Sequence, residues 1–248
     1  MTELIFAAFL WAGAQNALAG GGSFITLPML MFAGLDARSA NITSTLALFP
    51  AQIAAAWSGR RAVADAAGLP FRVLAVISVT GGALGAALLL VTSQSFFAHL
   101  VPWLVLFATT VFAWGSFGPR TARAQRLGRI GAAVAQLSIS VYGGYFGGAI
   151  GFLMFAALTA AAVPLRAAGA TKNVLAAAMN ASAVALFAFS PQVRWGPAGV
   201  GAAGAFMGGL IGAMLLQRIS ERVLRVLVIL IGLALTVGLF VHARPAQP

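Results

Sequence analysis

The sequence has no cysteine and very little negative charge. The absence of cysteine from all 248 residues excludes disulfide bonds and metal sites built from thiolates. Acidic residues number only four, and charged residues make up 8% of the chain. A soluble domain carries about 25% charged residues on average. This composition therefore excludes an ordinary soluble domain.

Hydrophobic residues are correspondingly abundant, at 61% of the chain. They gather into six long apolar segments, each close to the roughly 20 residues that cross a bilayer as a helix. These segments span residues 40–58, 70–92, 96–117, 173–190, 197–217 and 222–242. Charged residues lie in short clusters between the segments, as in proteins that cross the membrane several times. We therefore expect an all-α polytopic membrane protein.

Lysine and arginine give the chain a net charge of +11. An excess of positive charge that is clustered on one face is typical of nucleic-acid binding. Here the basic residues lie at the ends of apolar segments instead, where they orient a membrane protein and contact lipid headgroups. We therefore expect membrane lipids, and no nucleic acid, as partners.

The chain contains an internal repeat. The segment GGALGAALL, which begins at Gly81, returns in the second half of the chain as GGLIGAMLL, which begins at Gly208, with six of nine positions identical. A second set of matches, at almost the same separation, aligns Gly20, Phe24, Arg38 and Thr43 with Gly148, Phe152, Arg166 and Thr171. Duplication in a very apolar chain is common among membrane transporters. We expect one membrane domain, divided into a first repeat (1–118), a basic cytoplasmic linker (119–128), a second repeat (129–243) and a tail (244–248).

Two further apolar stretches, 3–33 and 129–162, are broken in the middle by glycine. Glycine clusters of this kind interrupt helices. Interrupted backbone at membrane depth survives only where protein or a water-filled cavity surrounds it. Each stretch therefore either crosses the membrane as a broken helix or turns back as a re-entrant hairpin.

The distribution of lysine and arginine distinguishes these two possibilities. If all eight segments cross, nine basic residues face the inside and six face the outside. If the broken stretches turn back, the second repeat is inverted and the split becomes twelve inside to three outside. The second split agrees far better with the positive-inside rule. We therefore predict two inverted repeats, each with one re-entrant hairpin and three transmembrane helices, and keep eight crossing helices as the alternative.

A short helix is predicted to follow each glycine break, beginning near Ser23 or near Gly151. A helix start presents unpaired N–H groups and the positive end of the helix dipole, which favour an anion. Two such starts, related by inverted symmetry, would face each other near the middle of the membrane, where transporters of this design bind their substrate. Glycines also allow close helix packing, and that alternative remains open for both breaks. We assign packing alone to Gly81, Gly82, Gly85, Gly208, Gly209 and Gly212.

A second group of polar residues opens the crossing that follows each break. Thr43 and Ser44 align with Thr171 and Lys172 in the register of the repeat. Some of these side chains could simply cap helices. Lys172, the only lysine in the chain, could extend to the membrane surface. Alternatively, Lys172 is a fixed cation beside an anion site.

Two amides, Gln52 and Asn180, also align with each other in this register. They could hydrogen-bond across helices or bind an oxyanion through their NH₂ groups. The substrate-binding residues predicted from the sequence are Gly21, Gly22, Ser23, Thr43, Ser44, Gln52, Gly147, Gly148, Thr171, Lys172, Asn173 and Asn180.

The chain resembles the TauE/SafE family of sulfite exporters over nearly its whole length, in the pattern GGGSFITLPMLMFAGLDARSANITSTLALFP and its degenerate second copy GGYFGGAIGFLMFAALTAAAVPLRAAGATKNVL. The matching residues are Gly20, Gly21, Gly22, Pro28, Arg38, Thr43 and Ser44, then Gly147, Gly148, Arg166, Gly169 and Thr171. Lys172 and Asn173 depart from the usual Ser-Leu, which leaves the substrate open. The resemblance implies an exporter of sulfite, a sulfonate or a related organic anion in the bacterial inner membrane.

Two other functions remain open. The chain could be a membrane subunit or scaffold that transports nothing. It could also be an intramembrane enzyme with Ser23 as nucleophile and His99 as its base, provided that the two lie within hydrogen-bond reach. We expect the transporter, with a small anionic substrate and with no catalytic residue, metal or cofactor. The sequence assigns no coupling ion and no oligomeric state.

Overall fold

The computed structural model describes residues 1–18, 21–117, 127–215 and 221–242. The described residues form ten α-helices, one 3-10 turn and an isolated bridge between Ala66 and Leu69. The first five helices are α1 (Thr2–Leu18), α2 (Ser23–Phe32), α3 (Ala37–Gly59), α4 (Phe71–Val91) and α5 (Gln94–Phe117), with the turn η1 (Arg60–Ala62) after α3. The last five are α6 (Arg129–Tyr145), α7 (Ile150–Ala160), α8 (Leu165–Phe187), α9 (Trp195–Leu215) and α10 (Glu221–His242).

The prediction of an all-α fold is confirmed for these residues. The helices agree with the six apolar segments in number and order, but α3 and α8 begin three and eight residues before the segments 40–58 and 173–190. A break also lies inside each of the two further stretches. The predicted tail, and most of the predicted linker, lie outside the described residues.

The two sets of five helices match in length and spacing. α3 and α8 each contain 23 residues, α1 and α6 each contain 17, and α4 and α9 each contain 21. α3 begins at Ala37 and α8 begins at Leu165, and in each case the aligned arginine, Arg38 or Arg166, comes next. The helices therefore follow the period of the sequence repeat.

Packing between the two sets is reciprocal. α1 packs on α9 while α6 packs on α4, and α3 packs on α9 while α8 packs on α4. α3 also packs on its counterpart α8, and α5 packs on its counterpart α10. Each of these helix contacts thus has an equivalent when the two sets are exchanged, as in an arrangement with a pseudo-twofold axis.

The counterparts α3 and α8 run in opposite directions. The loop after α3 lies at the start of α8, because the Ala64 N–H donates to Thr171 Oγ1 over 2.9 Å. The start of α3 lies at the loop after α8, because Ser39 Oγ donates to Gln192 Oε1 over 3.0 Å. The residues just after α3 therefore lie at the same end of the molecule as the residues just before α8.

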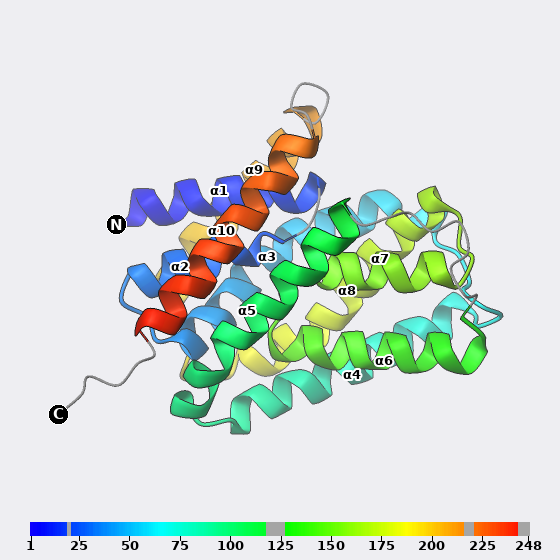
Figure 1. Ribbon diagram of the computed structural model, residues 1–248, viewed down its shortest axis with the longest axis horizontal. Coiled ribbons are helices and arrows are strands. Elements are labelled where there is room, and N and C mark those ends of the chain that lie inside the picture. The colour runs from blue at the N-terminus through cyan, green and yellow to red at the C-terminus, as the bar shows by residue number, and fades with distance from the viewer. Residues whose placement is uncertain (19–20, 118–126, 216–220, 243–248) are drawn as a thin grey trace.

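Each glycine break separates a long helix from a short helix that runs back. α1 leads away from the N-terminus and α2 returns toward it, and α6 and α7 repeat this course (Figure 1). The Leu127 N–H, just before α6, donates to the Ala160 carbonyl at the end of α7 over 2.9 Å. Gly21 and Gly147 have φ angles of +85° and +81° in the two turns, a conformation that glycine adopts readily. Both broken stretches therefore form hairpins.

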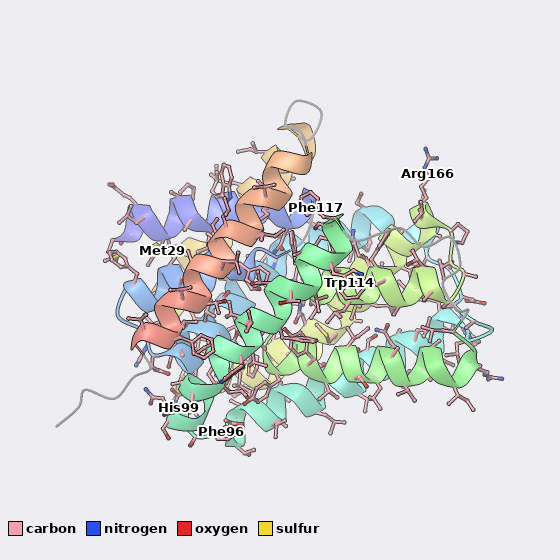
Figure 2. The ribbon with its side chains drawn as sticks, in the orientation of Figure 1. Met29, Phe96, His99, Trp114, Phe117 and Arg166 are labelled. Atoms are coloured by element: carbon pink, nitrogen blue, oxygen red, sulfur yellow. The ribbon has the colours of Figure 1, made fainter. Side chains whose placement is uncertain are left out.

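The outer surface of the bundle is strongly apolar. α4 and the part of α5 from Gln94 to Trp114 are long and apolar enough to cross a membrane. Phe96 and Trp114 are 61% and 72% exposed, and large aromatic residues are spread along α5 (Figure 2). Exposed apolar surface of this extent indicates contact with lipid.

The glycines of the repeated segment bring helices together. A Cβ at Gly85 would overlap the Val141 carbonyl of α6, and a Cβ at Gly208 would overlap the Leu10 carbonyl of α1. Small residues permit this close approach of backbones in membranes. The structure supports the packing role predicted for these two glycines.

Candidate functional site

A cavity of about 380 Å³ lies between the two sets of helices. Its wall comes from α1, α3, α8 and α9 and from the starts of α2 and α7. The cavity extends from the glycine breaks to Ser58, an exposed residue near the end of α3. This volume lies in the range of small-molecule sites. Six of the predicted substrate-binding residues line the cavity: Gly21, Ser23, Gln52, Gly147, Lys172 and Asn173.

The starts of α2 and α7 both face the cavity. Ser23 begins α2, Ile150 and Gly151 begin α7, and all three line the wall. Within the described chain, their backbone N–H groups have no carbonyl acceptor. Unpaired N–H groups and the positive end of a helix dipole together favour an anion.

Asn16, near the end of α1, makes the two helix starts different. Its Oδ1 accepts a hydrogen bond from the Gly22 N–H over 2.8 Å, and the residue also lines the cavity. Ala149, which precedes α7, provides no side-chain cap. The predicted site omitted Asn16. The signal that could have identified it was a polar side chain inside an apolar segment, shortly before the glycine cluster.

Lys172, near the start of α8, brings its ammonium group to the start of α7. A Cβ on Gly151 would lie 3.6 Å from Lys172 Nζ. The lysine is half-buried and, in the described part of the chain, has neither a hydrogen-bond partner nor an ion-pair partner. The described residues that line the cavity include no acid. A cation without a counterion thus lies beside the uncapped helix start.

Gln52 on α3 and Asn180 on α8 bond to each other. Asn180 Nδ2 donates to Gln52 Oε1 over 2.6 Å. Gln52 lines the cavity, whereas Asn180 is only 3% exposed. Because these residues occupy the same position in the register of the sequence repeat, the bond joins equivalent positions of α3 and α8.

Thr43 and Thr171 lie away from the cavity lining and hold loops. Thr43 Oγ1 accepts from the Arg194 N–H over 3.2 Å, and Thr171 Oγ1 accepts from the Ala64 N–H over 2.9 Å. Both threonines are fully buried. Each therefore ties its own helix to a loop of the other set.

The remaining predicted residues also lie outside the lining. Ser44 Oγ lies 2.6 Å from Thr26 Oγ1, and both side chains are buried. Gly22 contacts Asn16. A Cβ at Gly148 would lie 2.6 Å from the Phe146 ring. The structure thus brings six of the predicted residues to one cavity and leaves the others in the surrounding packing.

In the described residues, no hydrogen bond joins Ser23 to His99, the pair considered for an intramembrane enzyme. Ser23 lines the cavity. His99 is exposed near the start of α5, and its Nδ1 lies 2.7 Å from the Ser95 carbonyl. His99 and Arg166 lie toward opposite ends of the molecule (Figure 2). In the described residues, no three histidine, aspartate or glutamate side chains are grouped to hold a metal.

The sequence of the chain matches the family model of the sulfite exporter TauE/SafE over residues 5–239. This match includes every residue that lines the cavity. The chain belongs to this family. The resemblance noted in the sequence is therefore confirmed. No solved structure matches the chain.

Similar proteins from three bacteria carry transporter names. A "Probable membrane transporter protein" of Haemophilus influenzae is 27% identical over 242 residues, which cover 95% of this chain and 93% of the relative. The "Probable membrane transporter protein YfcA" of Escherichia coli K12 is 26% identical over 239 residues, covering 95% and 88%. The "Probable membrane transporter protein ORF9" of a Sinorhizobium species is 27% identical over 255 residues, covering 100% and 95%. TauE/SafE membership and these relatives indicate a membrane transporter.

Proposed function

We propose that the protein is a multi-pass transporter of the bacterial inner membrane that exports a small anion. Sulfite, a sulfonate or a related organic anion is the proposed cargo. It binds in the cavity between the two repeats, near the middle of the membrane. The observation that carries this proposal is the unpaired Lys172 ammonium beside the uncapped start of α7.

An inverted arrangement of the two repeats supports this function. The antiparallel course of α3 and α8 and the return of both hairpins favour three crossings and one re-entrant hairpin in each repeat. With this topology, twelve of the lysine and arginine residues face one side and three face the other. The positive-inside rule then makes the side with Arg60 and Arg166 cytoplasmic.

The direction of access is consistent with export. The cavity reaches Ser58, which lies just before Arg60 at the end that we assign to the cytoplasm. An anion from the cytoplasm therefore reaches Lys172 without crossing the packed centre of the bundle. An exporter needs such an opening to load its cargo.

The charges of the cavity favour an anionic cargo. Lys172 supplies one fixed positive charge, and the described lining supplies no negative charge. Coulomb attraction is stronger in a low-dielectric interior than in bulk water. The amides of Asn16 and Asn173 add further N–H donors. Phe206 offers apolar contact, which an organic anion uses better than sulfite does.

The test is the replacement of Lys172 by methionine in purified protein reconstituted into liposomes. A hydrogen bond to a charged group contributes about 1.5–3 kcal/mol, so we expect anion uptake to lose affinity by about tenfold to hundredfold. Lys172→Arg should retain part of the affinity because it keeps the charge. Arg166→Met is the matched control, since Arg166 is an exposed cation on the same helix.

Sulfite and a two-carbon sulfonate serve as the transported probes. If wild-type protein moves either anion and Lys172→Met moves it with unchanged affinity, Lys172 does not bind the cargo. If wild-type protein moves no small anion in either direction, the protein is a non-transporting membrane subunit. Equal losses in Lys172→Met and Arg166→Met would indicate a general effect of surface charge.

A further inference from the structure

The cavity has a counterpart in the other repeat that is packed shut. The register of the sequence repeat relates five cavity residues to a second group on α3, α4 and α8. The cavity residues are Ala51, Ala54, Ala55, Ala176 and Gly209, and their counterparts are Met179, Ser182, Ala183, Leu48 and Gly82. We call this second group the closed cleft.

Solvent exposure separates four of the five pairs, whereas Ser182 and its counterpart Ala54 are both partly exposed. In the closed cleft, Met179 and Ala183 are 0% exposed and Leu48 is 2% exposed. Their counterparts Ala51, Ala55 and Ala176 are all partly exposed and line the cavity. These three positions are therefore open in one half of the molecule and packed in the other, while the contact between Ser182 and Val79 lies at the edge of the packed group, where Val79 is 44% exposed.

A hydrogen bond between helices holds the closed cleft together. Ser182 Oγ, on α8, lies 2.8 Å from the Val79 carbonyl of α4 and 2.7 Å from the Met179 carbonyl of its own helix, so these two acceptors share its one proton. The counterparts of these residues are Ala54 and Phe206, which both line the open cavity. Alanine has no hydroxyl group, so the open side cannot form the equivalent bond.

Helix packing differs at the same place. A Cβ on Gly82 would overlap the Met179 carbonyl, so α4 lies directly against α8. On the open side, a Cβ on Gly209 would lie 3.7 Å from the Ala51 Cβ, an ordinary contact. The pair α4 and α8 corresponds in sequence to the pair α9 and α3, but the helices of the first pair lie closer together at this position.

We propose that the closed cleft is the second access passage of the transporter, and that the Ser182–Val79 hydrogen bond is its gate. When α4 and α8 separate, the cleft opens to the face opposite the cavity, and α3 and α9 close over Ala54 and Phe206. Two repeats of one design can exchange such arrangements around a fixed site. This inference rests on the proposed transport function, because only a transporter needs two passages.

The natural absence of cysteine allows each passage to be probed with one thiol. Ala55→Cys and Ala176→Cys probe the open cavity, and their counterparts Ala183→Cys and Leu48→Cys probe the closed cleft. A membrane-impermeant maleimide is added to one face of sealed vesicles at a time. We expect the first pair to react from the cytoplasmic face and the second pair to react only from the opposite face, at a slower rate.

The gate itself is tested in the Leu48→Cys background. Ser182→Ala removes the hydroxyl, and interhelical hydrogen bonds in membranes are weak enough that we expect Leu48→Cys to react about threefold to tenfold faster. Thr110→Ala is the matched control, because the Thr110 hydroxyl bonds only to Leu106 of its own helix. It should leave the rate unchanged.

Failure of the gate and failure of the proposed cargo give different results. If Ala183→Cys and Leu48→Cys both stay unreactive from the opposite face in protein that transports, the closed cleft is not a passage. If Ser182→Ala changes the Leu48→Cys rate no more than Thr110→Ala does, Ser182 is not the gate. If the expected labelling pattern holds while no tested anion moves, the gate stands and the anionic cargo is wrong.

Discussion

The two halves of this molecule have the same framework and different chemistry. α3 and α8 agree in length, and Thr43 and Thr171 each tie their helix to a loop of the opposite half. At the position of Lys172, however, the first half has Ser44, which is bonded to Thr26 in a buried contact. Features that occur twice therefore build the architecture, and features that occur once are candidates for function.

The helix starts show the same contrast. The first hairpin uses Asn16 to satisfy the Gly22 N–H, so the protein itself provides an acceptor at the start of α2. The second hairpin leaves the start of α7 uncapped and brings Lys172 beside it. A duplicated framework thus offers two potential anion sites, and a few side chains favour the second.

The largest expected effect on stability concerns two equivalent glycines around which the helices pack differently. Gly82→Ala places a Cβ against the Met179 carbonyl, and overpacking costs about 1–3 kcal/mol or more. Gly209→Ala, its counterpart, meets only the Ala51 Cβ at 3.7 Å and should change stability by less than about 0.5 kcal/mol. Thermal unfolding of both variants in detergent measures the difference. Equal melting temperatures would mean that α4 lies no closer to α8 than α9 lies to α3.

Substitutions at the two equivalent threonines should have a smaller effect on stability, and the two effects should be equal. Thr43→Val and Thr171→Val each leave one loop N–H, of Arg194 or of Ala64, without its acceptor. Each should lower the free energy of unfolding by about 1 kcal/mol. Thr159→Val is the control, because its hydroxyl bonds only within α7. A loss in one variant alone would show that the two ties are not equivalent.

Sequence reasoning located the breaks in the hairpins because glycine clusters interrupt helices wherever they occur. It placed two helix starts too late. The hydropathy of residues 165–172 is reduced by Arg166 and Lys172, yet α8 begins at Leu165, directly after Pro164. Likewise, α3 begins at Ala37 because Asp36 accepts from the N–H groups of Arg38 and Ser39. Capping and helix propensity decide a helix start, and hydropathy does not report either.

The candidate site was harder to predict than the fold. Lys172, Ser23 and Gln52 were chosen because each lies near a break or at matched depth, and all three line the cavity. The contribution of α9, through Phe206 and Gly209, depends on which helices become neighbours. No periodicity within a single helix contains that information. The roles proposed for the cavity residues stay predictions until transport is measured.

The smallest expected effect on stability concerns the hydrogen bond between Asn180 and Gln52, which joins the two halves. Gln52→Leu, Asn180→Leu and the double variant form a double-mutant cycle. Hydrogen bonds of this kind contribute about 0.6 kcal/mol on average in a membrane protein, so we expect a coupling energy of that size in detergent unfolding.

The same cycle separates a structural amide from one that contacts the cargo. Asn180 is only 3% exposed, whereas Gln52 lines the cavity, so only Gln52 can touch a bound anion directly. If Gln52 binds the oxyanion, Gln52→Leu weakens anion binding in a titration while Asn180→Leu affects it less. If both variants leave binding unchanged and the coupling energy persists, the pair only joins α3 to α8. Equal weakening by both would instead mean that the bond positions Gln52 for the cargo, which gives this contact between the two halves a direct part in transport.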